Sequence, residues 1–269
     1  MPLTQLIVLA IVQGLTEFLP VSSTGHISLL QMFAGFSEQG LPLDFAVRVG
    51  TFLAACAYFW RDLGAMLIGV WRLLRGKRDP GAQLALQIIV ASIPALGAAW
   101  AFDTYVGASM NQLMVIGWTT VGYAVLLMVV DKACMTIKRV EHASYGDAVL
   151  MGLAQILALV PGTGRVGIAM SMARLLGYER VEAARFSMLL SVPILLANAA
   201  WLGLKLDSAG QLALTQEVLI GIAISFTAGL LAIAVMMAWL KRSTFTPFVI
   251  YRLILGGFVL AVAYGYVQT

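Results

Sequence analysis

The chain has 269 residues, of which 61% are hydrophobic and 11% are charged, and its formal net charge is +4. This composition excludes an ordinary water-soluble domain, and apolar runs of about twenty residues indicate an all-α polytopic membrane protein. The stretch 218–240 is apolar on all sides, which excludes the alternating pattern of a transmembrane β-barrel. The basic residues cluster at the ends of apolar segments and not along an aromatic stripe, so we expect a membrane partner and no nucleic acid.

Six segments, taken in chain order, are long and apolar enough to cross a bilayer, whose hydrocarbon core requires about 20 helical residues. We expect transmembrane helices at 43–60, 83–101, 112–130, 183–203, 217–240 and 246–266. Together they predict a single membrane domain that covers 1–269.

Basic residues are distributed unevenly over the connections between these segments. The connection 61–80 carries five Lys or Arg and 131–142 carries three, whereas 31–42 and 102–111 carry none. Because cytoplasmic loops are enriched in Lys and Arg, we expect the first two connections in the cytoplasm and the last two outside.

Two further apolar segments, 3–36 and 145–178, are interrupted near the middle by Pro20 and Pro161. Neither half of either segment is long enough to cross alone, but each whole segment is long enough to enter the membrane and turn back. We therefore expect two re-entrant helix-loop-helix hairpins, one entering from each side.

The order of elements occurs twice along the chain. A shift of 141 positions places Pro20 on Pro161, and each hairpin is followed by a span, a connection and two further spans. We interpret the chain as an inverted repeat of approximately 1–130 and 131–269. In such repeats, broken helices meet near the bilayer midplane and form a site.

The first hairpin concentrates polar side chains in an otherwise apolar chain. Gln13 and Glu17 are four residues apart, so they share one face of the first half-helix. His26 lies just inside the second half-helix. The N-cap region of that half-helix suits an anion, because free N–H groups and the positive dipole end meet there with three hydroxyls, Ser22, Ser23 and Thr24.

The second hairpin turns at PGTGR, in which Gly162, Thr163 and Gly164 precede Arg165. Glycine lets backbone N–H groups converge on an anion, and arginine adds a planar fork that matches phosphate oxygens. We therefore expect both helix N-termini and the charged groups of the two hairpins to surround one anionic ligand. If Gly164 contributes only its N–H group, Gly164→Ser should be tolerated.

Structural roles compete with this interpretation. The hydroxyls can serve as helix caps, and Gln13 can bond a neighbouring helix. Glu17, His26 and Arg165 can form a buried polar network, although ionisable side chains inside a membrane usually mark function.

Arg48, in the span after the first hairpin, also has two readings. It can contact the phosphate, or it can pair with Asp44 near the outer interface.

The motifs QGLTEFLPVSSTGH (13–26) and PGTGRVG (161–167) resemble the two signature regions of the integral membrane undecaprenyl-diphosphate phosphatase family, also known for bacitracin resistance. The resemblance extends over the length, the motif order and the hydrophobic pattern of the chain. The second motif departs from the family pattern, in which Ser, Ser and Thr usually stand where this chain has Gly164, Val166 and Ala169. A neutral amide is usual at the position of Arg48.

The resemblance implies hydrolysis of undecaprenyl diphosphate, or another polyprenyl diphosphate, to the monophosphate and inorganic phosphate. This reaction recycles the lipid carrier of cell-wall synthesis at the outer face of the bacterial plasma (inner) membrane. A lipid-carrier flippase or transporter of the same architecture is the alternative, and a fold that only binds its ligand is a second one. A homodimer is the candidate assembly.

Roles follow from this chemistry. Phosphoryl transfer needs positioning and charge neutralisation, which we assign to Arg165 and the two helix N-termini. Glu17, with Gln13, can hold a divalent cation, Mg²⁺ or Ca²⁺, or orient the nucleophile. His26 is the natural acid or base near neutral pH, and the nucleophile is Ser23, His26 or a water. The expected substrate-binding residues are Gln13, Ser22, Thr24, Gly162, Thr163, Gly164 and Arg48.

Overall fold

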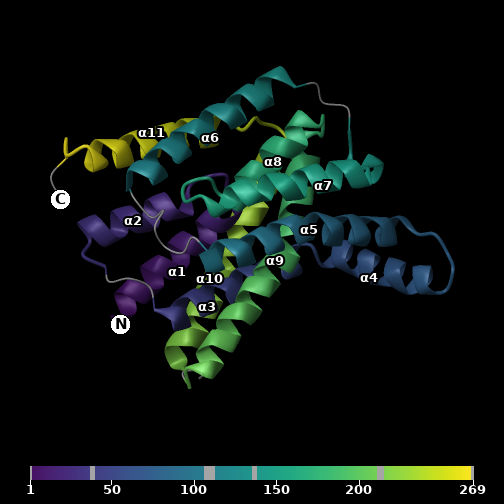
Figure 1. Cartoon of the computed structure of the whole chain (residues 1–269), viewed down its shortest axis with the longest axis horizontal. Helices are drawn as coiled ribbons and strands as arrows, with labels where there is room; N and C mark the ends of the chain where they lie inside the picture. Colours follow the sequence, from purple (N-terminus) through teal and green to yellow (C-terminus); the bar gives the residue numbers. More distant parts are fainter. Residues whose placement is uncertain (1, 37–39, 106–112, 135–137, 211–214, 268–269) are drawn as a thin grey trace.

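The computed structural model describes residues 2–36, 40–105, 113–134, 138–210 and 215–267, and these ranges contain helices but no β-sheet (Figure 1). In chain order the elements are α1 (Leu3–Phe18), α2 (Ser23–Phe33), α3 (Leu41–Tyr58), α4 (Trp60–Leu74), α5 (Pro80–Tyr105), α6 (Leu113–Ala133), η2 (Val140–His142), α7 (Tyr145–Ala154), η3 (Gln155–Leu159), α8 (Arg165–Leu175), α9 (Arg180–Ser208), α10 (Gln216–Leu240) and α11 (Thr246–Ala263).

Within the described residues, six helices are long and apolar enough to cross a membrane: α3, α5, α6, α9, α10 and α11. They coincide with the six predicted spans, and their ends differ from the predicted ends by a few residues. The prediction of an all-α polytopic membrane protein is therefore confirmed.

The connection 61–80 is largely helical, although its charge suggested a loop. Its first part forms α4, which follows α3 after a break at Phe59 and packs along α5 (Figure 1). The two helices approach closely because Gly69 and Gly81 face the partner backbone. A Cβ at Gly69 would lie 2.3 Å from Ala82 N, and one at Gly81 would lie 2.3 Å from Ala65 O.

Both predicted hairpins are helix-break-helix segments in the structure. In the first, Leu19 adopts an extended backbone, as residues before proline do, and α1 ends there. Ser22 then caps α2, because its side chain accepts a hydrogen bond from Gly25 N. In the second, α7 and η3 end before Pro161 and α8 begins after Gly164. None of these pieces is long enough to span alone, as a re-entrant path requires.

Helices of the first half of the chain pack against helices of the second half. α10 packs on α3 and α1, while α5 packs on α9 and α7, and α6 packs on α11. Two repeats related by a two-fold axis would produce such pairs. The division of the chain into repeats of approximately 1–130 and 131–269 stays a prediction.

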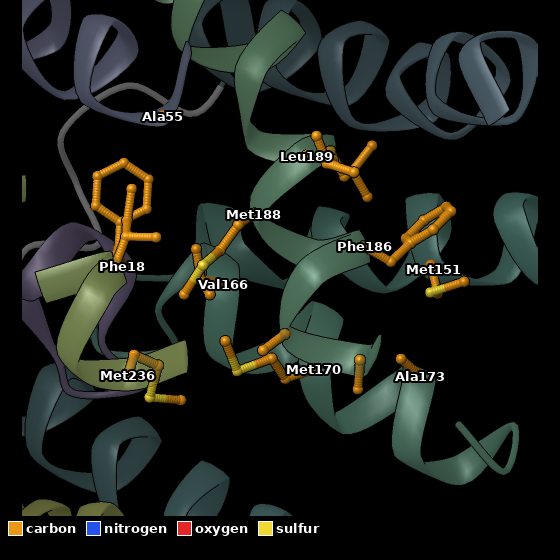
Figure 2. Close-up of a cluster of buried hydrophobic side chains, with 14 of the residues drawn as sticks. Phe18, Ala55, Met151, Val166, Met170, Ala173, Phe186, Met188, Leu189 and Met236 are labelled. Carbon is orange, nitrogen blue, oxygen red and sulfur yellow. The ribbon is translucent and has the colours of Figure 1, made fainter. Parts of the chain in front are cut away.

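The hydrophobic core lies against the breaks of both hairpins (Figure 2). Phe18 of α1 and Val166 of α8 are buried there with Met188 of α9 and Met236 of α10. Phe18 directly follows Glu17, and Val166 directly follows Arg165. Packing of the apolar neighbours therefore fixes where these two charged side chains emerge.

Candidate functional site

A cavity of about 430 Å³ lies where the two hairpins meet α3, α5 and α9. One part of its wall is polar and comes from both hairpins, with Glu17 and Ser23 from the first and Arg165 from the second. The other part is apolar, with Val47, Leu96, Ile194, Trp201 and Leu202. The cavity thus suits an amphiphile with a polar head and a hydrocarbon tail.

An ion-pair chain crosses the polar part of the cavity. Arg165 Nη2 donates to Glu17 Oε1 at 2.6 Å, and Arg48 Nη1 lies 3.7 Å from Glu17 Oε2. Arg48 Nε in turn donates to Asp44 Oδ1 at 3.2 Å. Two guanidinium groups and two carboxylates therefore compensate one another, and Lys205 also lines the cavity. An incoming anion can take over the arginine N–H donors, which match phosphate bidentately.

The two breaks are joined directly. Gly162 N donates to Thr24 Oγ1 at 2.8 Å, so the backbone of the second turn rests on α2, the second helix of the first hairpin. The carbonyls of that turn point the other way, because Arg252 donates to Gly162 O and Thr163 O, and Thr119 donates to Pro161 O at 2.6 Å. α8 begins without a side-chain cap, which leaves its first N–H groups for a ligand.

The hydroxyls of the first break have different surroundings. Ser22 is fully buried and acts as the N-cap of α2. Ser23 and Thr24 line the cavity, and Ser23 Oγ is 3.5 Å from Thr16 O. Of the three, only Ser23 faces the cavity without a short hydrogen bond in the described residues, so its geometry suits a nucleophile best.

His26 does not line the cavity in this structure. Its Nδ1 lies 2.6 Å from Ser22 O and its Nε2 lies 2.5 Å from Tyr251 OH, and the two rings stack. A carbonyl only accepts, so Nδ1 carries the proton and Nε2 of the neutral ring accepts from Tyr251. Both ring nitrogens are therefore engaged with α2 and α11.

The second turn needs its glycines. Gly162 has a φ of +96°, and a Cβ there would lie 2.0 Å from Thr119 Oγ1. Gly164 has a φ of +80°, which strains any L side chain although the space around it is open. This strain argues against the expectation that Gly164→Ser is tolerated. Thr163 is buried beside them and does not line the cavity.

Gln13, the remaining predicted residue, lines the cavity beside Glu17. Both offer the hard oxygen ligands that Mg²⁺ and Ca²⁺ prefer. Within the described residues, no three His, Cys, Asp or Glu side chains are grouped to hold a metal. The oxygen atoms of Gln13 and Glu17 suit such a cation chemically, but these two side chains supply only part of its coordination shell.

Two further buried polar residues lie at this site, of which the sequence interpretation passed over Arg252 and favoured helix packing for Gln155. Arg252 is 1% exposed and holds the second turn by its carbonyls, and Gln155 is 2% exposed in the cavity wall. Arg252 carried a signal, since a charged residue inside an apolar span marks function by default.

Comparison with known proteins adds independent evidence. The sequence profile of the family described as "Bacitracin resistance protein BacA" matches residues 6–258. A protein named "Undecaprenyl-diphosphatase 1" from Rhodospirillum rubrum is 50% identical over 98% of this chain and 96% of its own length. Proteins named "Undecaprenyl-diphosphatase" from a Ruegeria species and Alteromonas mediterranea are 43% and 38% identical, over 98% and 97% of this chain and 100% and 98% of their own lengths.

Proposed function

The chain belongs to the family described as bacitracin resistance protein BacA, and from this membership we propose how its cavity acts. The protein is an undecaprenyl-diphosphatase, which hydrolyses undecaprenyl diphosphate to the monophosphate and inorganic phosphate. Transport by the same architecture is not favoured, because the full-length relatives carry the name of the hydrolase.

We place the diphosphate in the polar part of the cavity and the prenyl chain along its apolar wall. Arg165 and Arg48 turn their donors from Glu17 to phosphate oxygens, while the first N–H groups of α8 neutralise further charge. Glu17 keeps the two guanidinium groups aligned before the substrate enters. The observation that carries this proposal is the Arg165–Glu17 contact of 2.6 Å inside a cavity that is both polar and apolar.

Ser23 Oγ or a water attacks the terminal phosphorus, and the bond from that phosphorus to the bridging oxygen breaks. The lipid monophosphate leaves with the bridging oxygen. If Ser23 attacks, water then displaces it and releases inorganic phosphate. His26 is a proposed acid or base, and it must leave Tyr251 to reach the reacting groups.

A divalent cation would be held by Gln13 and Glu17 together with the diphosphate, whose negative charge it would reduce. We expect a chelator to lower the rate and added Mg²⁺ or Ca²⁺ to restore it.

The decisive experiment measures phosphate release from farnesyl diphosphate by the purified protein in detergent, with Arg165→Lys as the comparison. Detergent removes any transmembrane gradient, so release by the parent and loss in the variant support hydrolysis at this site. A parent that releases no phosphate would contradict the proposed function.

We further propose that the protein lies in the bacterial inner membrane with the cavity open to the outer face. Cysteine labelling in a background without Cys56 and Cys134 tests the orientation. An impermeant reagent applied outside should modify Leu41→Cys and spare Lys77→Cys. A homodimer remains a prediction, which the mass of the detergent-solubilised protein tests.

A further inference from the structure

One buried amide in the cavity wall takes part in none of the contacts described above. Gln155 is the first residue of η3, the short helix that leads to Pro161 and the second turn. It is 2% exposed, and it lines the cavity together with Glu17 and Arg165. Its Nε2 has no hydrogen-bond partner among the described residues.

A buried donor without an acceptor is unfavourable, so native folds rarely leave one. Gln87 shows how this fold satisfies a comparable side chain. It is also 2% exposed, but its Nε2 donates to Ala143 O at 2.5 Å. The two glutamines therefore differ in whether the protein itself supplies the acceptor.

The position of Gln155 indicates which acceptor is missing. Gln155 lines a cavity whose other polar groups include Arg48, Arg165 and the start of α8, all of which attract anions. An amide N–H₂ group only donates, and phosphate oxygens only accept when ionised. A neutral donor adds direction without adding charge, so it can fix the orientation of a phosphate that the arginines attract.

We infer that Gln155 is a substrate-contact residue whose Nε2 donates to a phosphate oxygen of the prenyl diphosphate. This inference rests on the proposed function, because it assumes that the diphosphate occupies this cavity. Free inorganic phosphate offers the same acceptor, so the test has to treat the lipid diphosphate and the free phosphate separately.

The test compares Gln155→Met with Gln87→Met, which makes the same change at an equally buried amide away from the cavity. For the purified proteins in detergent we would measure KM and kcat with farnesyl diphosphate, inhibition by inorganic phosphate, and the thermal midpoint without ligand. Gln155→Met should raise KM about tenfold, as expected for one hydrogen bond to a charged group, with kcat near that of the parent. Its midpoint should equal or exceed that of the parent, whereas Gln87→Met should lower the midpoint and leave KM unchanged.

Inhibition by phosphate then locates the contact. A parallel loss of inhibition in Gln155→Met supports contact with the terminal phosphoryl group, and unchanged inhibition with a raised KM supports contact with the phosphate that stays on the lipid. Gln155→Glu keeps the shape of the side chain but removes both donors, so it should raise KM at least as much as Gln155→Met. It replaces Gln155→Met in the test if the methionine variant fails to fold.

A parental KM in a folded Gln155 variant would overturn the inference, as would failure of both variants to fold, which would assign the amide a structural role. In either case a parent that releases phosphate leaves the proposed function intact. A parent without phosphate release would instead remove the premise.

Discussion

The guanidinium of Arg165 and the carboxylate of Glu17 meet at 2.6 Å although 148 positions separate them in the chain. Glu17 precedes the break at Pro20, and its buried neighbour Phe18 holds it in place. Arg165 follows the break at Pro161, and its buried neighbour Val166 holds it in place. The contact brings the polar clusters of both hairpins to one cavity, where an anionic ligand can exchange with the carboxylate.

Double substitution at this pair should show that it acts as a unit. Arg165→Lys keeps the charge but loses the planar fork, and Glu17→Gln removes the charge at nearly constant shape, so each should lower kcat about a hundredfold to a thousandfold. The kcat of the double variant should be little below that of the less active single variant, because groups that act together give non-additive losses.

The matched control for this pair is Arg139–Glu179, which lies 3.5 Å apart and is largely exposed. Arg139→Lys and Glu179→Gln should leave phosphate release unchanged, as most surface ion pairs contribute little. Independent, multiplicative losses at Glu17 and Arg165 would contradict a shared site.

Substitutions of Arg48 and of its neighbour Asp44 should change KM in opposite directions. Arg48→Gln, which restores the amide usual in the family pattern, should raise KM for farnesyl diphosphate about tenfold, because one cation facing the diphosphate is lost. Asp44→Asn should lower KM, since it removes a negative charge from the same cavity. If both variants only lower the thermal midpoint and leave KM alone, Arg48 serves to anchor α3.

Gly164→Ser tests the backbone of the second turn. With a φ of +80°, a side chain should cost about 1–3 kcal/mol of stability and reduce phosphate release. Gly64→Ser is the control, because a Cβ at this helical position meets no atom within 4 Å. A fully active Gly164→Ser protein would show that the turn relaxes into the conformation that serine-containing family members use.

The link between His26 and Tyr251 can be separated from the proposed role of His26 in proton transfer. Tyr251→Phe should lower the free energy of unfolding by about 1 kcal/mol, for one hydrogen bond, and leave kcat unchanged. His26→Ala should lower both. Stopped assays and thermal unfolding of the two variants check this, and equal kcat values would argue that His26 only connects α2 to α11.

Hydropathy predicted the six spans well, because lipid requires long apolar helices and the pattern is strong. Pro20 and Pro161 likewise located both breaks. The helical nature of 60–74 was missed because its charges suggested a loop, while its close packing on α5 depends on Gly69 and Gly81 facing a backbone that only the fold supplies.

Side-chain direction was harder to predict than position. The ring of His26 is oriented by Tyr251, a partner 225 residues away in the chain, and no local sequence pattern predicts this contact. Arg252 was overlooked for the opposite reason. Its charge inside an apolar span is visible in the sequence, but the carbonyls that it binds belong to a turn 89 and 90 positions earlier.

The Thr24–Gly162 hydrogen bond has a mechanical consequence. Together with the Arg165–Glu17 contact, it ties the first half of the chain to the second at the centre of the molecule. Rocking of the halves against each other would break both ties and dismantle the phosphate site in the same movement. The prenyl diphosphate should therefore enter, and the lipid monophosphate leave, sideways through the lipid-facing flank, while the two halves of the chain keep their relative positions.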